Sequence, residues 1–141
     1  MGDLLYGILQ KFGYSHPLHP IFTHLVIGPV IAALLISLFA WIFNKPQGMR
    51  TARHLTVFAF VMWFFTAAMG LIDWQHFYSA QRMTAITMKM ILASILFVVL
   101  LSTILVNRRL PVESRLPIIL YAVSTLCVIG LGFYGGNIVY G

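Results

Sequence analysis

Long uninterrupted runs of apolar residues make up most of the chain. Four of them approach the length that a transmembrane helix needs, about 20 residues for a hydrocarbon core of ~30 Å. They cover residues 21–43, 55–72, 84–106 and 116–134. Because the apolar residues are continuous rather than alternating with polar ones, the runs predict helices and exclude a transmembrane barrel. We therefore expect an all-α fold, an integral membrane four-helix bundle.

The segment before the first run has a different pattern. Its apolar residues recur at helical spacing among polar ones, and they are Leu4, Leu5, Ile8, Leu9 and Phe12. This spacing predicts a short helix that either lies in the membrane interface or packs on the bundle. Since only short connections separate the runs, residues 1–141 are expected to form a single transmembrane domain with no separate soluble part.

Composition and charge agree with a membrane protein and suggest its orientation. The chain is 60% hydrophobic and only 9% charged, whereas soluble domains carry roughly 25% charged residues. Its net charge of +6 does not indicate nucleic-acid binding, because the basic residues form short clusters between the apolar runs. Six of the nine Lys and Arg residues lie in the loops 44–53 and 107–115. The positive-inside rule makes these loops cytoplasmic, so both termini are expected on the outer, periplasmic side of a bacterial inner membrane.

Histidine is frequent for so apolar a chain, with five residues. Under the expected topology four of them lie near the outer face, namely His16, His19, His24 and His76. His54 lies among basic residues at the cytoplasmic end and needs no special role. An imidazole inside an apolar helix must find a partner or lose several kcal/mol of solvation. His24 therefore either hydrogen-bonds a neighbour such as Asp73, Asn137 or a backbone carbonyl, or it ligates a metal.

Haem iron is the metal that this pattern favours. Imidazole is a standard haem ligand, and helical bundles hold cofactors between facing helices. His24 and His76, near the outer ends of the first two spans, are the predicted pair of iron ligands. His19 and His16 are further candidates, and the thioether of Met88 is another. Since the chain has a single cysteine, no Cys-x-x-Cys-His motif can attach haem covalently, and the haem would be b-type.

A zinc site is the alternative for the first three histidines. Residues that precede proline are pushed out of helical geometry, and Pro17 and Pro20 directly follow His16 and His19. These two histidines are therefore expected in an extended segment rather than on one face of a helix. Together with His24 they would suit zinc, but the lack of cysteine partners and the scarcity of carboxylates disfavour it.

Asp73 closes the second apolar run, at a depth where an acid usually pairs with a cation or a histidine. Arg82, Lys89 and His24 are its candidate partners. An ion pair of this kind is the simpler interpretation. The other interpretation gives Asp73 a proton-carrying role beside a haem or a quinone.

Three sequence motifs carry a resemblance to a known family. They are residues 15–24 (SHPLHPIFTH), residues 70–73 (GLID) and residues 135–140 (GGNIVY). In order and spacing they resemble the signatures of the bacterial membrane family catalogued as domain of unknown function 2231. The resemblance covers nearly the whole chain, and it implies a four-helix membrane domain that is linked to redox or respiratory contexts and suspected of binding haem. The family commonly has a histidine early in the third helix. Residues 84–90 contain none, so Met88 or His76 would have to take its place.

Two functions follow from these observations. The first is a small b-type cytochrome-like electron-transfer subunit, part of a larger respiratory or redox complex with other membrane or periplasmic subunits. The second is a non-catalytic accessory or anchoring subunit without a cofactor. A transporter is disfavoured, because the spans contain almost no charged residues. The sequence has no hydrolase or kinase motif and leaves open whether the protein is an enzyme, and its large lipid-facing surface is compatible with a homo-oligomer.

Overall fold

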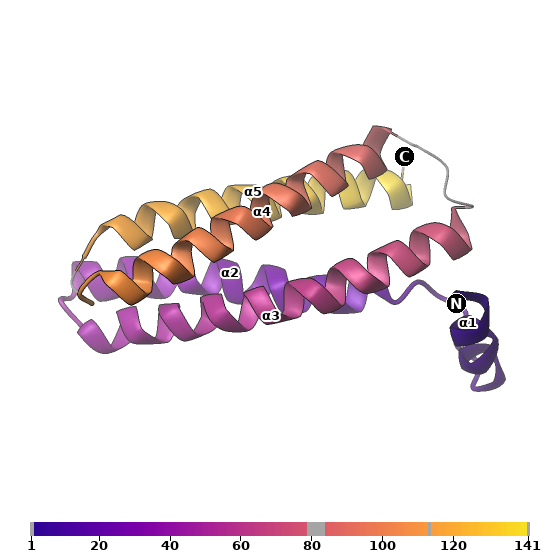
Figure 1. Cartoon of the computed structure of the whole chain (residues 1–141), viewed down its shortest axis with the longest axis horizontal. Helices are drawn as coiled ribbons and strands as arrows, with labels where there is room; N and C mark the ends of the chain where they lie inside the picture. Colours follow the sequence, from indigo (N-terminus) through magenta and orange to yellow (C-terminus); the bar gives the residue numbers. More distant parts are fainter. Residues whose placement is uncertain (1, 79–83, 113, 141) are drawn as a thin grey trace.

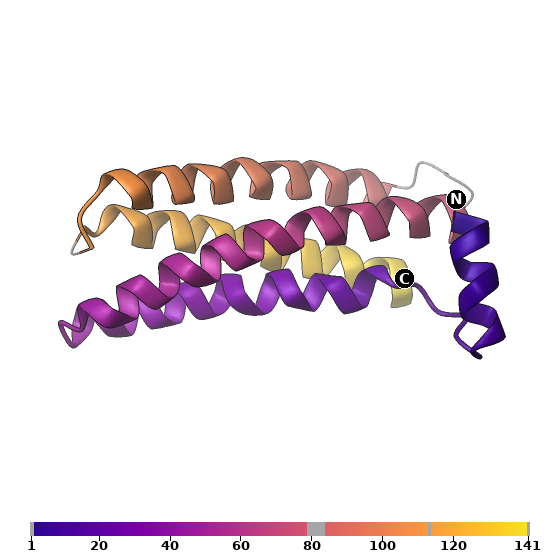
Figure 2. The same ribbon diagram turned by 60° about the horizontal axis from the view of Figure 1, so that its bottom comes forward.

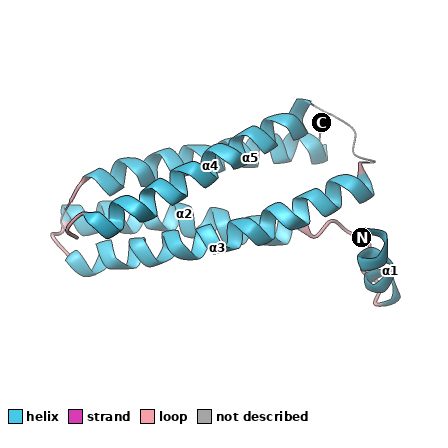
Figure 3. Ribbon diagram, viewed as in Figure 1, coloured by secondary structure: helices cyan, strands magenta, loops and turns pink. Residues whose placement is uncertain are grey.

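The computed structural model describes residues 2–78, 84–112 and 114–140, and in these ranges it contains five helices and no strand. In chain order they are α1 (Gly2–Lys11), α2 (His19–Ile42), α3 (Pro46–Phe77), α4 (Thr84–Arg109) and α5 (Leu116–Tyr140). The last four are long and apolar enough to cross a membrane. The all-α membrane fold expected from the sequence is thus confirmed (Figure 1, Figure 3).

The helices extend beyond the apolar runs that predicted them. α2 begins at His19, so the extended conformation expected for this histidine is wrong, whereas His16 lies before the helix, as expected. Pro20 is tolerated in the first turn, where its missing N–H would have no helical partner anyway. α3 begins at Pro46 rather than near residue 55, and its first turns carry polar residues such as Arg50. Hydropathy marks the part of a helix that lies in lipid, whereas the helical hydrogen bonding continues into the interface.

The four long helices form an antiparallel bundle in which each helix contacts its two neighbours. α2 packs most extensively on α3, and α4 on α5, while contacts of α2 with α5 and of α3 with α4 close the ring. The α2–α3 and α4–α5 turns lie at one end of the bundle, here called the basic end (Figure 1). The guanidinium of Arg53 joins these turns by donating to the carbonyls of Leu110 at 3.0 Å and Pro111 at 2.9 Å. The expectation that both basic loops share one side of the molecule is confirmed.

Small and branched side chains fill the interior of the bundle. On α2 the buried residues are Val26, Val30, Ala33, Ser37 and Ala40. Their alternating spacing of four and three residues is that of helices packed side by side. Of these residues, Val26 and Val30 belong to a central cluster with the buried Leu96 and Leu100 of α4 and Val128 of α5. Small residues let helices approach closely inside a membrane, where van der Waals packing drives their association.

A buried polar pair lies nearer the basic end. The side-chain amide of Asn107 on α4 donates to the hydroxyl of Tyr121 on α5 at 3.0 Å, and both residues are buried. Polar groups inside a membrane bundle need such partners, so this bond helps to fix α4 against α5. The single cysteine, Cys127, is buried in the apolar cluster and serves packing there.

α1 crosses the opposite end of the bundle, here called the terminal end (Figure 2), and contacts α3. It buries the side chain of Tyr6, whereas Leu4, Ile8 and Phe12 are exposed. Leu4 and Ile8 are four residues apart and form an apolar stripe along the helix, and Phe12 follows directly after its end. α1 therefore packs on the bundle and also presents an apolar face of the kind that lies in a membrane interface.

Candidate functional site at the terminal end

A buried carboxylate joins three helices at the terminal end of the bundle. Asp73, near the end of α3, is only 4% exposed. Its Oδ1 accepts a hydrogen bond from the hydroxyl of Tyr6 on α1, and its Oδ2 accepts one at 2.8 Å from the backbone N–H of His19, the first residue of α2. The first turn of α2 (HPIF) contains no acidic residue of its own. Asp73 therefore supplies the negative charge that stabilises a helix N-terminus.

Tyr6 completes this junction and was not anticipated from the sequence. It is 1% exposed, and its hydroxyl also accepts a hydrogen bond at 3.1 Å from the backbone N–H of Leu18. Its ring stacks on that of His76, with centroids 4.5 Å apart, and meets Phe77 edge-on. Burial, and next the hydrogen bond to Asp73, raise the pKa of Tyr6 to about 12. The phenol therefore remains a hydrogen-bond donor far above neutral pH.

The ring of His19 is held against α3. Its Nδ1 lies 3.0 Å from the carbonyl oxygen of Thr66. Since a carbonyl only accepts, Nδ1 carries the proton, and Nε2 of the neutral ring keeps its lone pair. Gly70, one turn further along α3, leaves room for the ring, because a Cβ on it would lie 2.8 Å from Nδ1. Metal-binding histidines are commonly oriented by such a bond from the other ring nitrogen.

Lys89 brings a positive charge to the same end of the bundle. It lies on α4 seven residues before the buried Leu96, so it shares the inward side of that helix. It is half-buried and lies within electrostatic range of Asp73 and His19. Its Nζ is 3.8 Å from the position that a Cβ would take on Gly135 of α5. We call Tyr6, His19, Asp73 and Lys89 together the terminal cluster.

His24 and His76, the predicted pair of iron ligands, have different surroundings. His24 is exposed. It stands two residues before the buried Val26, which is ~200° around the helix, and so it lies on the outward side of α2. His76 packs on the ring of Tyr6. His19, in contrast, lies against the backbone of α3 at Thr66 and Gly70.

The remaining predicted site residues lie outside the terminal cluster or outside the described residues. His16 is exposed and meets the ring of Tyr14 edge-on, and Met88 is exposed on α4. Arg82 and the side chain of Asn137 do not belong to the described part of the chain. Within that part, no group of three or more His, Cys, Asp or Glu side chains is placed to hold a metal ion, so the zinc alternative gains no support there.

The three sequence motifs meet at the terminal cluster. His19 of the first motif contacts both Gly70 and Asp73 of the second. Gly135 of the third motif lies beside Lys89. Residues far apart in the sequence thus build one polar site inside an apolar bundle.

The fold and this site define a class, the multi-pass helical membrane proteins with a polar cluster at one end of the bundle. More specifically, the chain belongs to the family of predicted membrane proteins known as DUF2231, whose model matches residues 15–141. The match confirms the family resemblance and includes all three motifs. No curated protein and no solved structure matches the chain.

Proposed function

We propose that this protein is an electron-transfer subunit of a membrane redox complex, a small b-type cytochrome whose haem iron is bound by His19. The orientation of the His19 ring is the observation that carries the proposal, since the carbonyl of Thr66 and the space at Gly70 fix it. The ring lies against a neighbouring helix, and the bond to Thr66 uses Nδ1 and not Nε2, the arrangement of many axial haem ligands. The histidine favoured from the sequence, His24, is exposed and suits this role less well.

The other members of the terminal cluster would handle charge beside the cofactor. A b-type haem supplies one-electron chemistry when it is bound. Asp73 and Lys89 are ionisable groups at membrane depth, where such residues act as ion pairs or proton carriers. A change of charge near them alters their proton affinity. We therefore assign these two side chains to charge compensation during electron transfer.

The proposed orientation places the terminal cluster at the periplasmic face of a bacterial inner membrane. It rests on the basic loops, which lie at the other end of the bundle (Figure 1) and are expected in the cytoplasm. Electron donors or acceptors would then be periplasmic or membrane-embedded subunits. The exposed apolar stripe of α1 would lie in the outer interface, close to such partners.

An accessory subunit without a cofactor is the second candidate function. It is favoured by the hydrogen bonds that Tyr6, His19 and Asp73 already make within the protein. The hydroxyl of Tyr6 binds Asp73, and Nδ1 of His19 binds the carbonyl of Thr66. Such a junction is useful on structural grounds alone, because it fixes α1 and α2 on α3.

A reduced-minus-oxidised absorption spectrum of the full chain in detergent separates the two functions. We expect a b-type band in the wild type that is lost in His19→Ala and retained in the matched variant His24→Ala. If the band is lost in His24→Ala and retained in His19→Ala, the iron ligands are His24 and His76 and not His19. A colourless wild-type protein with full helical content, also when haem is supplied during expression, would overturn the cytochrome and support the accessory subunit.

A further inference from the structure

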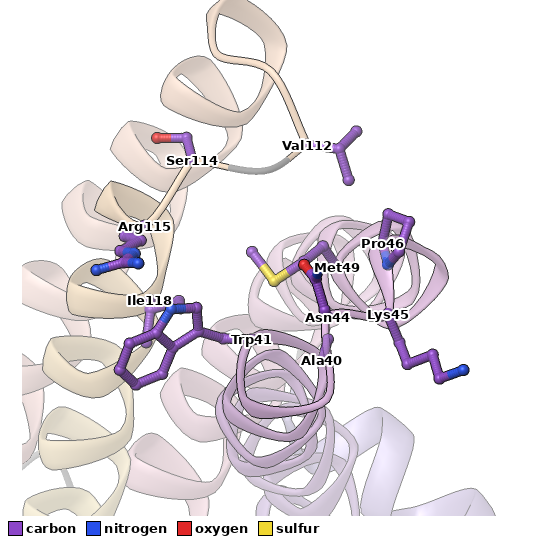
Figure 4. A pocket seen from close by; sticks show the side chains of 10 residues that line it. All are labelled: Ala40, Trp41, Asn44, Lys45, Pro46, Met49, Val112, Ser114, Arg115 and Ile118. Atoms are coloured by element: carbon purple, nitrogen blue, oxygen red, sulfur yellow. The ribbon is translucent and has the colours of Figure 1, made fainter.

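A cavity at the basic end is separate from the terminal cluster. Its volume is about 310 Å³, many times the ~30 Å³ that a water molecule occupies. The residues that line it are Ala40, Trp41, Asn44, Lys45, Pro46, Met49, Val112, Ser114, Arg115 and Ile118. Figure 4 shows Trp41 and Arg115 at one side of it and Pro46 across from them, with the side chain of Lys45 extending away from Arg115. The cavity therefore lies between the two turns of the basic end.

Among the described residues of this lining, the ionisable ones are Arg115 and Lys45, and the side chain of Lys45 is exposed and extends away from Arg115 (Figure 4). Asn44 and Ser114 add neutral hydrogen-bonding groups. The guanidinium of Arg115 lies 5.1 Å from the centroid of the Trp41 ring, a cation–π contact that holds it beside the cavity. Glu113, which stands next to Ser114 in the sequence, lies outside the described residues. The described lining suits an anion.

The starts of two helices add to this positive potential. α3 begins at Pro46 and α5 begins at Leu116, directly after Arg115. Their first turns, PQGM and LPII, contain no acidic residue. Because a helix N-terminus carries a partial positive charge, both helices favour an anion in the space between them.

The rest of the cavity and its surroundings are apolar. Trp41, Met49 and Ile118 contribute apolar surface to the lining. Exposed apolar side chains also occur near the ends of the two helices that line it, Phe39 and Ile42 on α2 and Leu116 and Ile119 on α5. Free phosphate would use only the cationic part of this site. A phospholipid would use both parts.

We propose that this cavity binds the phosphate head group of an anionic phospholipid, whose acyl chains lie along the exposed apolar surfaces of α2 and α5. Basic pockets between transmembrane helices at the level of the head groups are the usual binding sites of such lipids. Trp41 in the lining also indicates a position at the level of the head groups, because Trp is enriched at the membrane interface.

Native mass spectrometry of the full chain, titrated in detergent with phosphatidylglycerol, tests the proposal. Each Lys or Arg near an anionic lipid surface adds to binding, so we expect about fivefold weaker binding in Arg115→Gln, whose cation is held beside the cavity. Arg108→Gln is the matched control, since Arg108 is exposed at the same end and does not line the cavity. Its binding should remain unchanged. Far-UV circular dichroism verifies that each variant keeps its helices.

Three results would overturn the proposal. If Arg108→Gln weakens binding as much as Arg115→Gln, the basic end attracts anions without a site. If phosphatidylcholine is retained as well as phosphatidylglycerol, the cavity does not select for anionic lipids. If inorganic phosphate competes fully with the lipid at equal concentration, the occupant is free phosphate, and the acyl chains contribute nothing.

Discussion

The imidazole of His19 rests directly against the backbone of Gly70, on a neighbouring helix. A methyl group at Gly70 would lie 2.8 Å from Nδ1 of this ring and 3.0 Å from its Cε1. The glycine and the histidine belong to two separate sequence motifs, residues 70–73 and residues 15–24. This contact explains the glycine of the second motif. Because residue 70 has no side chain, the ring of His19 can reach the carbonyl oxygen of Thr66.

Gly70→Ala should therefore displace the ring of His19. Forcing an extra methyl group into a filled site typically costs about 1–3 kcal/mol, so the unfolding temperature in detergent should fall. If haem is bound as proposed, its absorption band should weaken or shift in the same variant. Gly132→Ala is the control, because a Cβ at Gly132 meets nothing within 4 Å. Equal stability of the two variants would show that the ring of His19 is not held in this position.

The sequence favoured His24 over His19 because His24 lies inside the first apolar run and because Pro20 predicted an extended conformation at His19. Hydropathy does not distinguish the sides of a helix that is apolar all round. Helical phase does distinguish them. His19 lies seven residues before the buried Val26, whereas His24 lies only two before it. The buried residues of α2, such as Ala33, recur at spacings of three and four residues. Extended towards the start of the helix, this periodicity places His19 and not His24 on the inward side.

The role of Tyr6 was not predictable from local pattern. Its hydrogen-bond partner, Asp73, is 67 positions away, and the contact exists only because α1 folds back over the end of the bundle (Figure 2). The four spans, in contrast, were predictable because lipid demands long apolar helices whatever their tertiary contacts. The limits of the helices were harder to predict, since α3 begins at Pro46 and its apolar run begins only at residue 55.

Tyr6→Phe should loosen α1 from the bundle. The substitution keeps the ring on His76 but removes the hydroxyl that donates to Asp73 and accepts from Leu18. A buried acceptor that loses its donor costs about 1–3 kcal/mol. Protease cleavage between α1 and α2 should become faster, as followed by mass spectrometry. Tyr14→Phe is the matched control, because its hydroxyl makes a single bond to the Pro17 carbonyl, and its cleavage rate should stay near that of the wild type.

The docking of α1 should also depend on pH through Tyr6. Its pKa is raised from 10.0 to about 12 in the folded protein, so between these values the undocked form loses a proton that the docked form retains. The stabilisation is complete below pH 10, declines as pH rises, and is lost above about pH 12. Hydrogen exchange of α1, measured across this window, should show the loss in the wild type. Tyr6→Phe should show no comparable change, and a parallel decline in both proteins would assign the effect to another group.

The orientation of the bundle can be tested with single cysteines in a Cys127→Ser background. Ser15→Cys introduces an exposed thiol at the terminal end, and Gln47→Cys introduces one at the basic end. Because the basic loops should be retained in the cytoplasm, a membrane-impermeant maleimide applied to spheroplasts should label Ser15→Cys. It should label Gln47→Cys only after the membrane is permeabilised. The reverse pattern would place the terminal cluster on the cytoplasmic side, and periplasmic redox partners would then be excluded as direct contacts of that cluster.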